Sequence, residues 1–436
     1  MLKAGFARLD ITPPFGTPIA GYFHPRCTKG VLDPLELNAL AISDGENTAV
    51  IIAADIIGIK SRIAAILRER IAARTGVAAD HVMIACLHQH TSFVLHNDPP
   101  PYSADMNNVD DPAYLDVLYR KFEDAAQMAI DDMADAVAET AAEETAVQLS
   151  FVRRYIMKEG PVATNPGRLN PNLVRPASDP DNTVRLVRFR RAGTKDIALV
   201  NFSTHPDVIG GEKNSADWPG FVRRYVEKDN PGVCCVFVNG AQGDTNHIDF
   251  FKEKQWDDRY AHSAFMGRTI ADTVRALWDK TTPHADGRIF GEVATVYSRT
   301  NTEGEERYDE QKAFYDAYEA GTLDYKPHIT ELAYAQRIIK LRTERIYRAV
   351  PVTVIGIGDI ALVGFGGEAF TCYANNARTD APDKFVIGVT CTNGYEGYLP
   401  SQAAFHEGGY ESSGSLYTDA IEGEVRAAAK EMLAKF

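Results

Sequence analysis

The chain has 436 residues, of which 45% are hydrophobic, and a formal charge of −14 at neutral pH. This is ample material for a large buried core, and no linker, low-complexity tract or internal repeat divides it, so we expect a single domain over residues 1–436. The acidic balance argues against a nucleic-acid partner, because binding to a phosphate backbone requires clustered lysine and arginine.

Membrane and export signals are not visible in the sequence. No apolar run approaches the roughly 18 residues of a transmembrane helix. The first residues, "MLKAGFARLDITPP", have neither the apolar region nor the cleavage site of a secretory signal. The six cysteines lack metal-finger spacing, and reduced thiols are the simplest interpretation. We therefore expect a cytoplasmic protein, although a trimmed secreted chain is compatible with the same features.

Strand-like and helical patterns alternate along the chain. The first half predicts two strands within 38–58 joined by a turn at Asp44-Gly45, a helix over 61–75, a buried strand over 81–88 and a long helix over 112–143. The second half predicts a Pro-, Asn- and Gly-rich loop over 159–183, strands over 197–205 and from 233, polar helices within 303–349, a hairpin over 352–370, a strand from 384 and a final helix over 416–436. This alternation indicates an α/β fold of mixed α+β type.

Polar side chains that suit chemistry follow four of the predicted strands. They are His88 with His90, His205, Glu368, and a tyrosine-rich loop near position 398. Strand ends can direct loop residues toward one point, and gathered histidine and carboxylate groups suit Zn²⁺. In an H-x-H pair on a strand, both side chains face the same way.

Each of these signals also has a purely structural interpretation. A lone strand-end histidine is more often a hydrogen-bonded structural residue than a ligand. Glu368 could simply be a favourable acidic group at a helix N-terminus, and the tyrosines could simply pack. The conjunction favours a metal site. The motifs of metallo-β-lactamases, binuclear metallophosphatases, serine hydrolases, H-E-x-x-H metalloproteases and Walker A nucleotide-binding proteins are all missing or incomplete.

A series of short motifs resembles one known family. In chain order they read "AGFARLDITPP", "LHQHTS", "NPGR", "NFSTHPDVIGGEKNSADWPG", "FVNGAQGDTNH", "GEAF" and "NGYEGYLPSQAAFHEGGYE". The series is similar to the catalytic domain of the neutral/alkaline, non-lysosomal ceramidases, and it covers nearly the whole chain. The resemblance implies stacked mixed β-sheets flanked by helices, with a zinc-dependent amidase site at the strand ends.

The resemblance also implies roles for individual residues. Four would bind zinc: His88, His205, Glu368 and Tyr398. His90 would transfer a proton beside the metal, while Arg168 and Tyr410 would polarise the scissile carbonyl. The zinc would activate a water molecule for attack on the amide of a small-molecule or lipid N-acyl substrate. Asp217 or Asp244 would orient a ligand histidine.

Departures from the family keep other functions open. The family's T-H-T-H-S-G-P reads "LHQHTSF" here, and we expect the chain to lack the C-terminal β-sandwich domain of known ceramidases. One alternative is therefore a hydrolase of a small, polar, non-lipid amide or ester on the same scaffold. Another is a catalytically silent metal-binding protein. The oligomeric state is left open.

Overall fold

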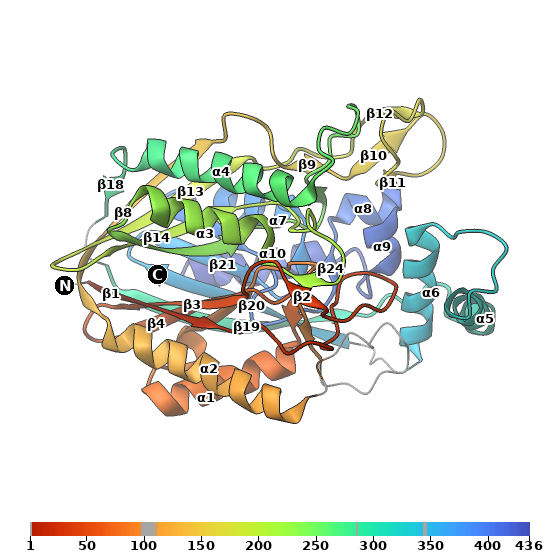
Figure 1. The fold of residues 1–436 in the computed structure, drawn as a ribbon. Coiled ribbons are helices and arrows are strands. Elements are labelled where there is room, and N and C mark those ends of the chain that lie inside the picture. The colour runs from red at the N-terminus through yellow and green to blue at the C-terminus, as the bar shows by residue number, and fades with distance from the viewer. Residues whose placement is uncertain (1, 97–108, 110, 285–286, 343–346) are drawn as a thin grey trace.

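Two mixed β-sheets form the centre of the computed structural model, which describes residues 2–96, 109, 111–284, 287–342 and 347–436 (Figure 1). The larger sheet has the order β16 (Val233–Asn239), β14 (Asp196–Phe202), β13 (Thr183–Arg191), β8 (Ala134–Glu144), β1 (Lys3–Asp10), β3 (Glu36–Ser43), β4 (Thr48–Ala54), β6 (Val82–Cys86), and β18 (Thr282–Pro283) pairs with β8. The second sheet has the order β19 (Ile289–Arg299), β20 (Tyr347–Ile357), β21 (Ile360–Phe365), β23 (Phe385–Val389).

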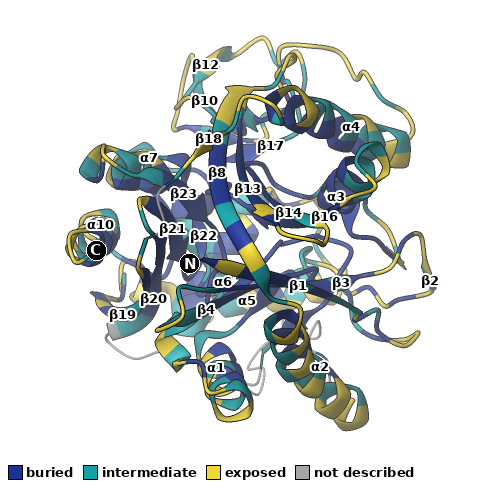
Figure 2. Ribbon diagram, turned by 90° about the vertical axis from the view of Figure 1, so that its left-hand side faces the viewer, coloured by how far each residue is buried: buried dark blue, intermediate teal, exposed yellow. Residues whose placement is uncertain are grey.

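The two sheets share one apolar core. On β3, alternate side chains face opposite ways: Leu40 belongs to the same buried cluster as Leu362 of the second sheet, whereas Leu37 and Ala39 belong to a cluster with α1 and α2. Figure 2 shows the consequence, since both sheets are largely buried while the outer faces of the helices are exposed.

Helices cover the outer faces of both sheets. The helices α1 (Ser61–Thr75) and α2 (Pro112–Asp131) pack against the half of the larger sheet that contains β1, β3, β4 and β6, and α3 (Asp217–Asp229) and α4 (Arg259–Leu277) pack against the half that contains β8, β13 and β16 (Figure 1). The second sheet is covered by α7 (Thr371–Asp380) and α10 (Ile421–Leu433). The other α-helices of the described residues are α5 (Tyr308–Glu319), α6 (Ile329–Leu341), α8 (Gln402–Glu407) and α9 (Tyr410–Gly414). Among the residues described, no helix has the length and apolar character needed to cross a bilayer.

Short strands complete the fold near the ends of the main ones. They are β2 (Gly30–Val31) with β15 (Lys213–Asn214), β5 (Gly58–Ile59) with β7 (Val94–Leu95), β9 (Phe151–Val152) with β17 (Thr245–Asn246), β22 (Glu368–Ala369) with β24 (Tyr398–Leu399), and the trio β10 (Arg154–Met157), β11 (Ala163–Thr164), β12 (Leu173–Pro176). The pair β22 and β24 is parallel and aligns Glu368 with Tyr398.

The segment 390–393 connects β6 and β16, the two edge strands of the larger sheet, through backbone hydrogen bonds. The N–H of Thr390 donates to Asn239 at the end of β16, while the N–H of Asn393 donates to Ile84 in β6. The segment directly follows β23, so it also attaches the second sheet to both edges. The carboxyl ends of β6, β14, β16 and β21 therefore converge.

Most of the predicted elements are present, and the mixed α/β class is confirmed. The Asp44-Gly45 turn joins β3 to β4, and the predicted 352–370 hairpin is β20 with β21. The helix predicted over 112–143 is wrong in its second half, because α2 ends at Asp131 and residues 134–144 form β8. The loop predicted over 159–183 contains β11 and β12, and the polar helices within 303–349 are α5 and α6, residues 343–346 lying outside the described part.

Candidate metal centre and active site

His88 follows β6 in a conformation that few residues adopt. Its φ is +74°, in the left-handed region that L-residues with a Cβ usually avoid. The backbone N–H of His88 donates to the Ile56 carbonyl at 3.0 Å, and its ring Nδ1 donates to the Ile57 carbonyl at 2.7 Å. These two bonds fix the ring so that Nε2 is left for another partner.

His205 is held in the same way three residues after β14. Its Nδ1 lies 3.0 Å from the carbonyl of Gln242, in the turn that follows β16. The ring is 1% exposed, and burial, reinforced by the nearby Arg153 cation, lowers its pKa to about 4. His205 is therefore a neutral imidazole with Nε2 turned inward, which is the form that binds metals.

Glu368 joins the two histidines at the start of β22. Its Oε2 lies 3.3 Å from Nε2 of His88 and 3.3 Å from Nε2 of His205, and the hydroxyl of Tyr395 donates to Oε1 at 3.2 Å. Burial opposes its charge, but the two histidines hold its pKa well below the usual range. The carboxylate is therefore ionised at neutral pH.

The donor set fits a tetrahedral metal ion. Zn²⁺ bonds of about 2.0–2.1 Å place neighbouring ligand atoms about 3.3–3.4 Å apart, which is the spacing from Glu368 to each histidine. The buried Nε2 of His205 and Oε2 of Glu368 have no hydrogen-bond partner of acceptable geometry. Leaving buried polar atoms unpaired costs free energy, so these two atoms indicate a binding site for a metal ion. The ligand nitrogens of His88, His90 and His205 also lie within 4.8 Å of one another.

His90 lies against this centre with both ring nitrogens unpartnered. Its ring centroid is 5.1 Å from that of His88 and 5.3 Å from that of His205, and its Nδ1 is 3.8 Å from Asp207. Burial, followed by the nearby His88, holds its pKa well below the usual range. His90 is thus a neutral base that is 8% exposed.

A buried arginine that the sequence did not single out lies beside Tyr398. Arg153, between β9 and β10, donates from Nη2 to the Tyr398 hydroxyl at 2.9 Å and to the Gly243 carbonyl at 2.8 Å, and from Nε to Glu411 at 2.7 Å. Burial alone would lower its pKa, but these partners raise it instead. The rings of Tyr398 and Tyr410 are 5.4 Å apart, so Arg153 and both tyrosines form one group.

Arg168 has backbone partners. Its Nη1 donates to the backbone carbonyls of Asp249, Lys252 and Glu253 at 2.9 to 3.4 Å, which closes the loop after β17. The structure therefore brings His88, His90, His205 and Glu368 together, pairs Tyr398 with Glu368 in neighbouring strands and sets Tyr410 against Tyr398, while Arg168 has a different set of contacts. A signal for Arg153 existed in "SFVRRY", where two arginines interrupt an apolar strand-like run.

The predicted orientation of a ligand histidine by Asp217 or Asp244 is wrong. The Nδ1 atoms of His88 and His205 bind backbone carbonyls instead. Asp217 accepts from the backbone N–H groups of Val208 and Ile209, just after His205. Asp244 accepts from the N–H and the hydroxyl of Thr371, just after Glu368. Both aspartates fix the backbone that follows a candidate ligand.

Two solved structures of ceramidases have a similar fold. The chain superposes on neutral ceramidase from Pseudomonas aeruginosa with a TM-score of 0.71 and 14% identity, covering 99% of this chain and 74% of that one. A ceramidase complexed with C2 gives a TM-score of 0.72 with the same identity and coverage. No family model matches the sequence, and no curated protein matches it significantly. The fold expected from the motifs is confirmed.

Proposed function

We propose that the protein is a zinc-dependent amidohydrolase that cleaves the C–N bond of an N-acyl substrate, as a ceramidase does. The observation that carries this proposal is the position of Glu368 Oε2, 3.3 Å from the Nε2 atoms of two buried histidines. The zinc would be held by His88, His205 and Glu368, and the neighbouring Tyr398 would be a further ligand beside the position taken by water. When bound, it would lower the pKa of a water molecule toward about 7 and act as a Lewis acid.

His90 is the proton carrier in this mechanism. Its ring lies beside those of His88 and His205, so it can accept a proton from the attacking water and then donate that proton to the leaving amine nitrogen. A neutral ring with both nitrogens unpartnered is ready for this role without first breaking another hydrogen bond.

Arg153 and Tyr410 bind the carbonyl oxygen in our proposal. Arg153 uses Nε and Nη2 for its contacts with Glu411, Gly243 and Tyr398, and Nη1 is the donor we assign to the substrate. Preorganised donors of this kind stabilise the developing oxyanion by about 3–4 kcal/mol each. We assign to Arg153 the part that the motif resemblance implied for Arg168, because Arg153 lies against the tyrosines.

Hydrolysis of N-acyl substrates by the purified protein tests the proposal. The protein is stripped with a chelator, reloaded with one equivalent of Zn²⁺ and incubated with ceramides of short and long acyl chain. Release of free fatty acid by the reloaded protein, and its loss in the stripped protein, is the expected result. A reloaded protein that binds zinc yet releases no amine or acid from ceramides or other N-acyl compounds would contradict the proposal and leave the ester hydrolase and the silent metal-binding protein.

A polar rim beside His90 favours the second candidate, a small polar amide or ester. The Tyr22 hydroxyl donates to Asp207, and the Arg26 guanidinium lies 4.0 Å from the centroid of the Tyr22 ring. A methyl group on Gly210 would lie 2.6 Å from the Arg259 guanidinium and 3.4 Å from the Tyr22 hydroxyl, so Arg259 borders the same rim. These groups suit a head group with hydroxyl or anionic character. Comparing ceramides with N-acyl amino acids in the same assay separates the two candidates.

A further inference from the structure

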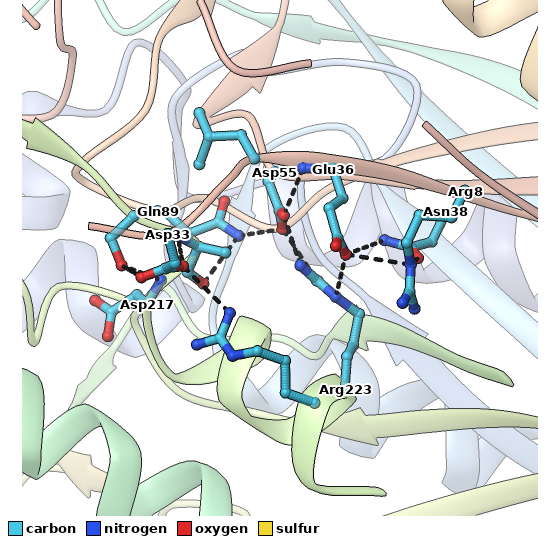
Figure 3. A network of polar contacts seen from close by, with 12 residues as sticks. Arg8, Asp33, Glu36, Asn38, Asp55, Gln89, Asp217 and Arg223 are labelled. Carbon is cyan, nitrogen blue, oxygen red and sulfur yellow. Dashed lines mark hydrogen bonds and ion pairs between the residues drawn. The ribbon is translucent and has the colours of Figure 1, made fainter. Parts of the chain in front are cut away.

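A buried network of charged and amide side chains includes Gln89, the residue between His88 and His90 in the chain (Figure 3). At its centre, Arg223 of α3 binds both oxygens of Asp55, at 3.0 and 2.6 Å. The Nε2 of Gln89 donates to the same carboxylate at 2.6 Å. Asp55 and Gln89 are fully buried and Arg223 is 2% exposed. We call these three residues the Asp55 network.

The Asp55 network touches the candidate metal centre from two directions. Gln89 is the residue between His88 and His90, and its side chain binds Asp55. The ring centroids of His88 and His90 are 5.1 Å apart. Asp55 belongs to the segment 54–57, whose carbonyls bind the backbone N–H of Leu87 and His88 and the ring of His88. One carboxylate therefore restrains both the turn and the backbone that orients the first ligand.

The arginine is itself fixed from its other side. Arg223 Nε lies 3.1 Å from Glu36, which lies 3.3 Å from Nε of Arg8, and Arg8 binds both oxygens of Glu227. Negative and positive side chains therefore alternate from Asp55 to Glu227 of α3. The guanidinium is planar and donates from both Nη atoms to Asp55, with Glu36 paired to it on the Nε side, so it has little freedom to move.

Stability alone does not account for such a network. Desolvation of buried ion pairs offsets most of their attraction, and apolar replacements are often neutral or stabilising. A geometric role fits better here, because His88 occupies a left-handed conformation that its surroundings must impose. Groups that hold metal ligands in place typically change metal affinity 10- to 100-fold when removed.

We propose that Gln89, Asp55 and Arg223 are positioning residues, which hold the His88–His90 turn in the geometry that binds the metal. This inference rests on the proposed function. Gln89→Met is the variant of choice, because it keeps the length of the side chain and removes only its donor and acceptor. Arg223→Lys keeps the charge but loses the fork to Asp55, so we expect an intermediate effect.

The test is Co²⁺ binding by the metal-free protein, followed through the visible absorption of the bound ion. We expect the Kd of Gln89→Met to rise by about 10- to 100-fold, with a change in band shape that reports altered coordination. Arg191→Met is the matched control. Arg191 is a buried arginine that binds Asp132, and the pairing of β13 with β14 places it at the end of the sheet opposite His205. It should lose thermal stability without changing the Kd or the spectrum.

Two results would overturn the inference, and they differ in whether the proposed function also fails. If Gln89→Met binds Co²⁺ like the unsubstituted protein and only its melting temperature falls, as in Arg191→Met, the network is purely structural and the proposed function stands. If the unsubstituted protein itself binds no Co²⁺, the metal centre fails, and the positioning role fails with it.

Discussion

Gly243→Ala should disable the candidate metal centre without touching a ligand. A methyl group on Gly243 would lie 2.3 Å from the backbone carbonyl oxygen of Glu368, whereas ordinary contacts begin at 3.4 Å. The two backbones must therefore separate by about 1.1 Å, and the N–H of Gly243 already binds the next carbonyl, that of Ala369. Metal–ligand distances tolerate only about 0.2 Å. A misplacement of about 1 Å costs about 100-fold in rate.

The measurement is metal content by mass spectrometry and kcat on the same preparation, beside thermal unfolding. We expect Gly243→Ala to remain folded, to retain far less than one zinc per chain and to lose about 100-fold in kcat. Gly423→Ala is the control, because nothing lies within 4 Å of a methyl group there. It should retain zinc and gain about 1 kcal/mol of helix stability. Full zinc occupancy and normal kcat in Gly243→Ala would refute the assigned position of Glu368.

Three further predictions follow from the same geometry. His88→Ala should lose both zinc and activity, whereas His90→Ala should keep zinc and lose about 10²–10⁴-fold in kcat; the reverse pattern in metal content would exchange their roles. Arg153→Met should lower kcat by about 10²–10³-fold with zinc retained, while Arg168→Met keeps a near-normal kcat; the opposite ranking would restore Arg168 as the carbonyl-binding group. Burial opposes the charge of Glu411, but its arginine partners hold its pKa below 4.5, so its stabilisation is present above pH 4.5 and is lost as the pH falls. Glu411→Gln should therefore lower the melting temperature at neutral pH and approach the unsubstituted protein in acid, and parallel melting curves at every pH would contradict this.

The larger part of the fold could be predicted because apolar periodicity marks buried strands well. One predicted helix continues as a strand instead. Residues 134–144, "ADAVAETAAEE", have the composition of a helix, yet they form β8 because they pair with β13 over nine residues and with β1 at their start. Long-range pairing overrides helix propensity, and nothing local in this segment reports it.

The candidate site likewise contains residues that the sequence predicts and one that it does not. His88, His205 and Glu368 were predictable, since each follows a strand whose end faces the others. Arg153 was not, because its partners Tyr398 and Glu411 lie about 250 positions away in the chain and meet it only in the fold. The single-domain organisation, the ligand role of Tyr398 and the location in the cell stay predictions.

The most direct test of the central claim is X-ray diffraction at the zinc absorption edge from crystals of the zinc-loaded protein. We predict one strong anomalous peak per chain, about 2.0–2.2 Å from Nε2 of His88, Nε2 of His205 and Oε2 of Glu368. A peak bound elsewhere, or none among these three atoms in a protein that still hydrolyses N-acyl substrates, would contradict the account.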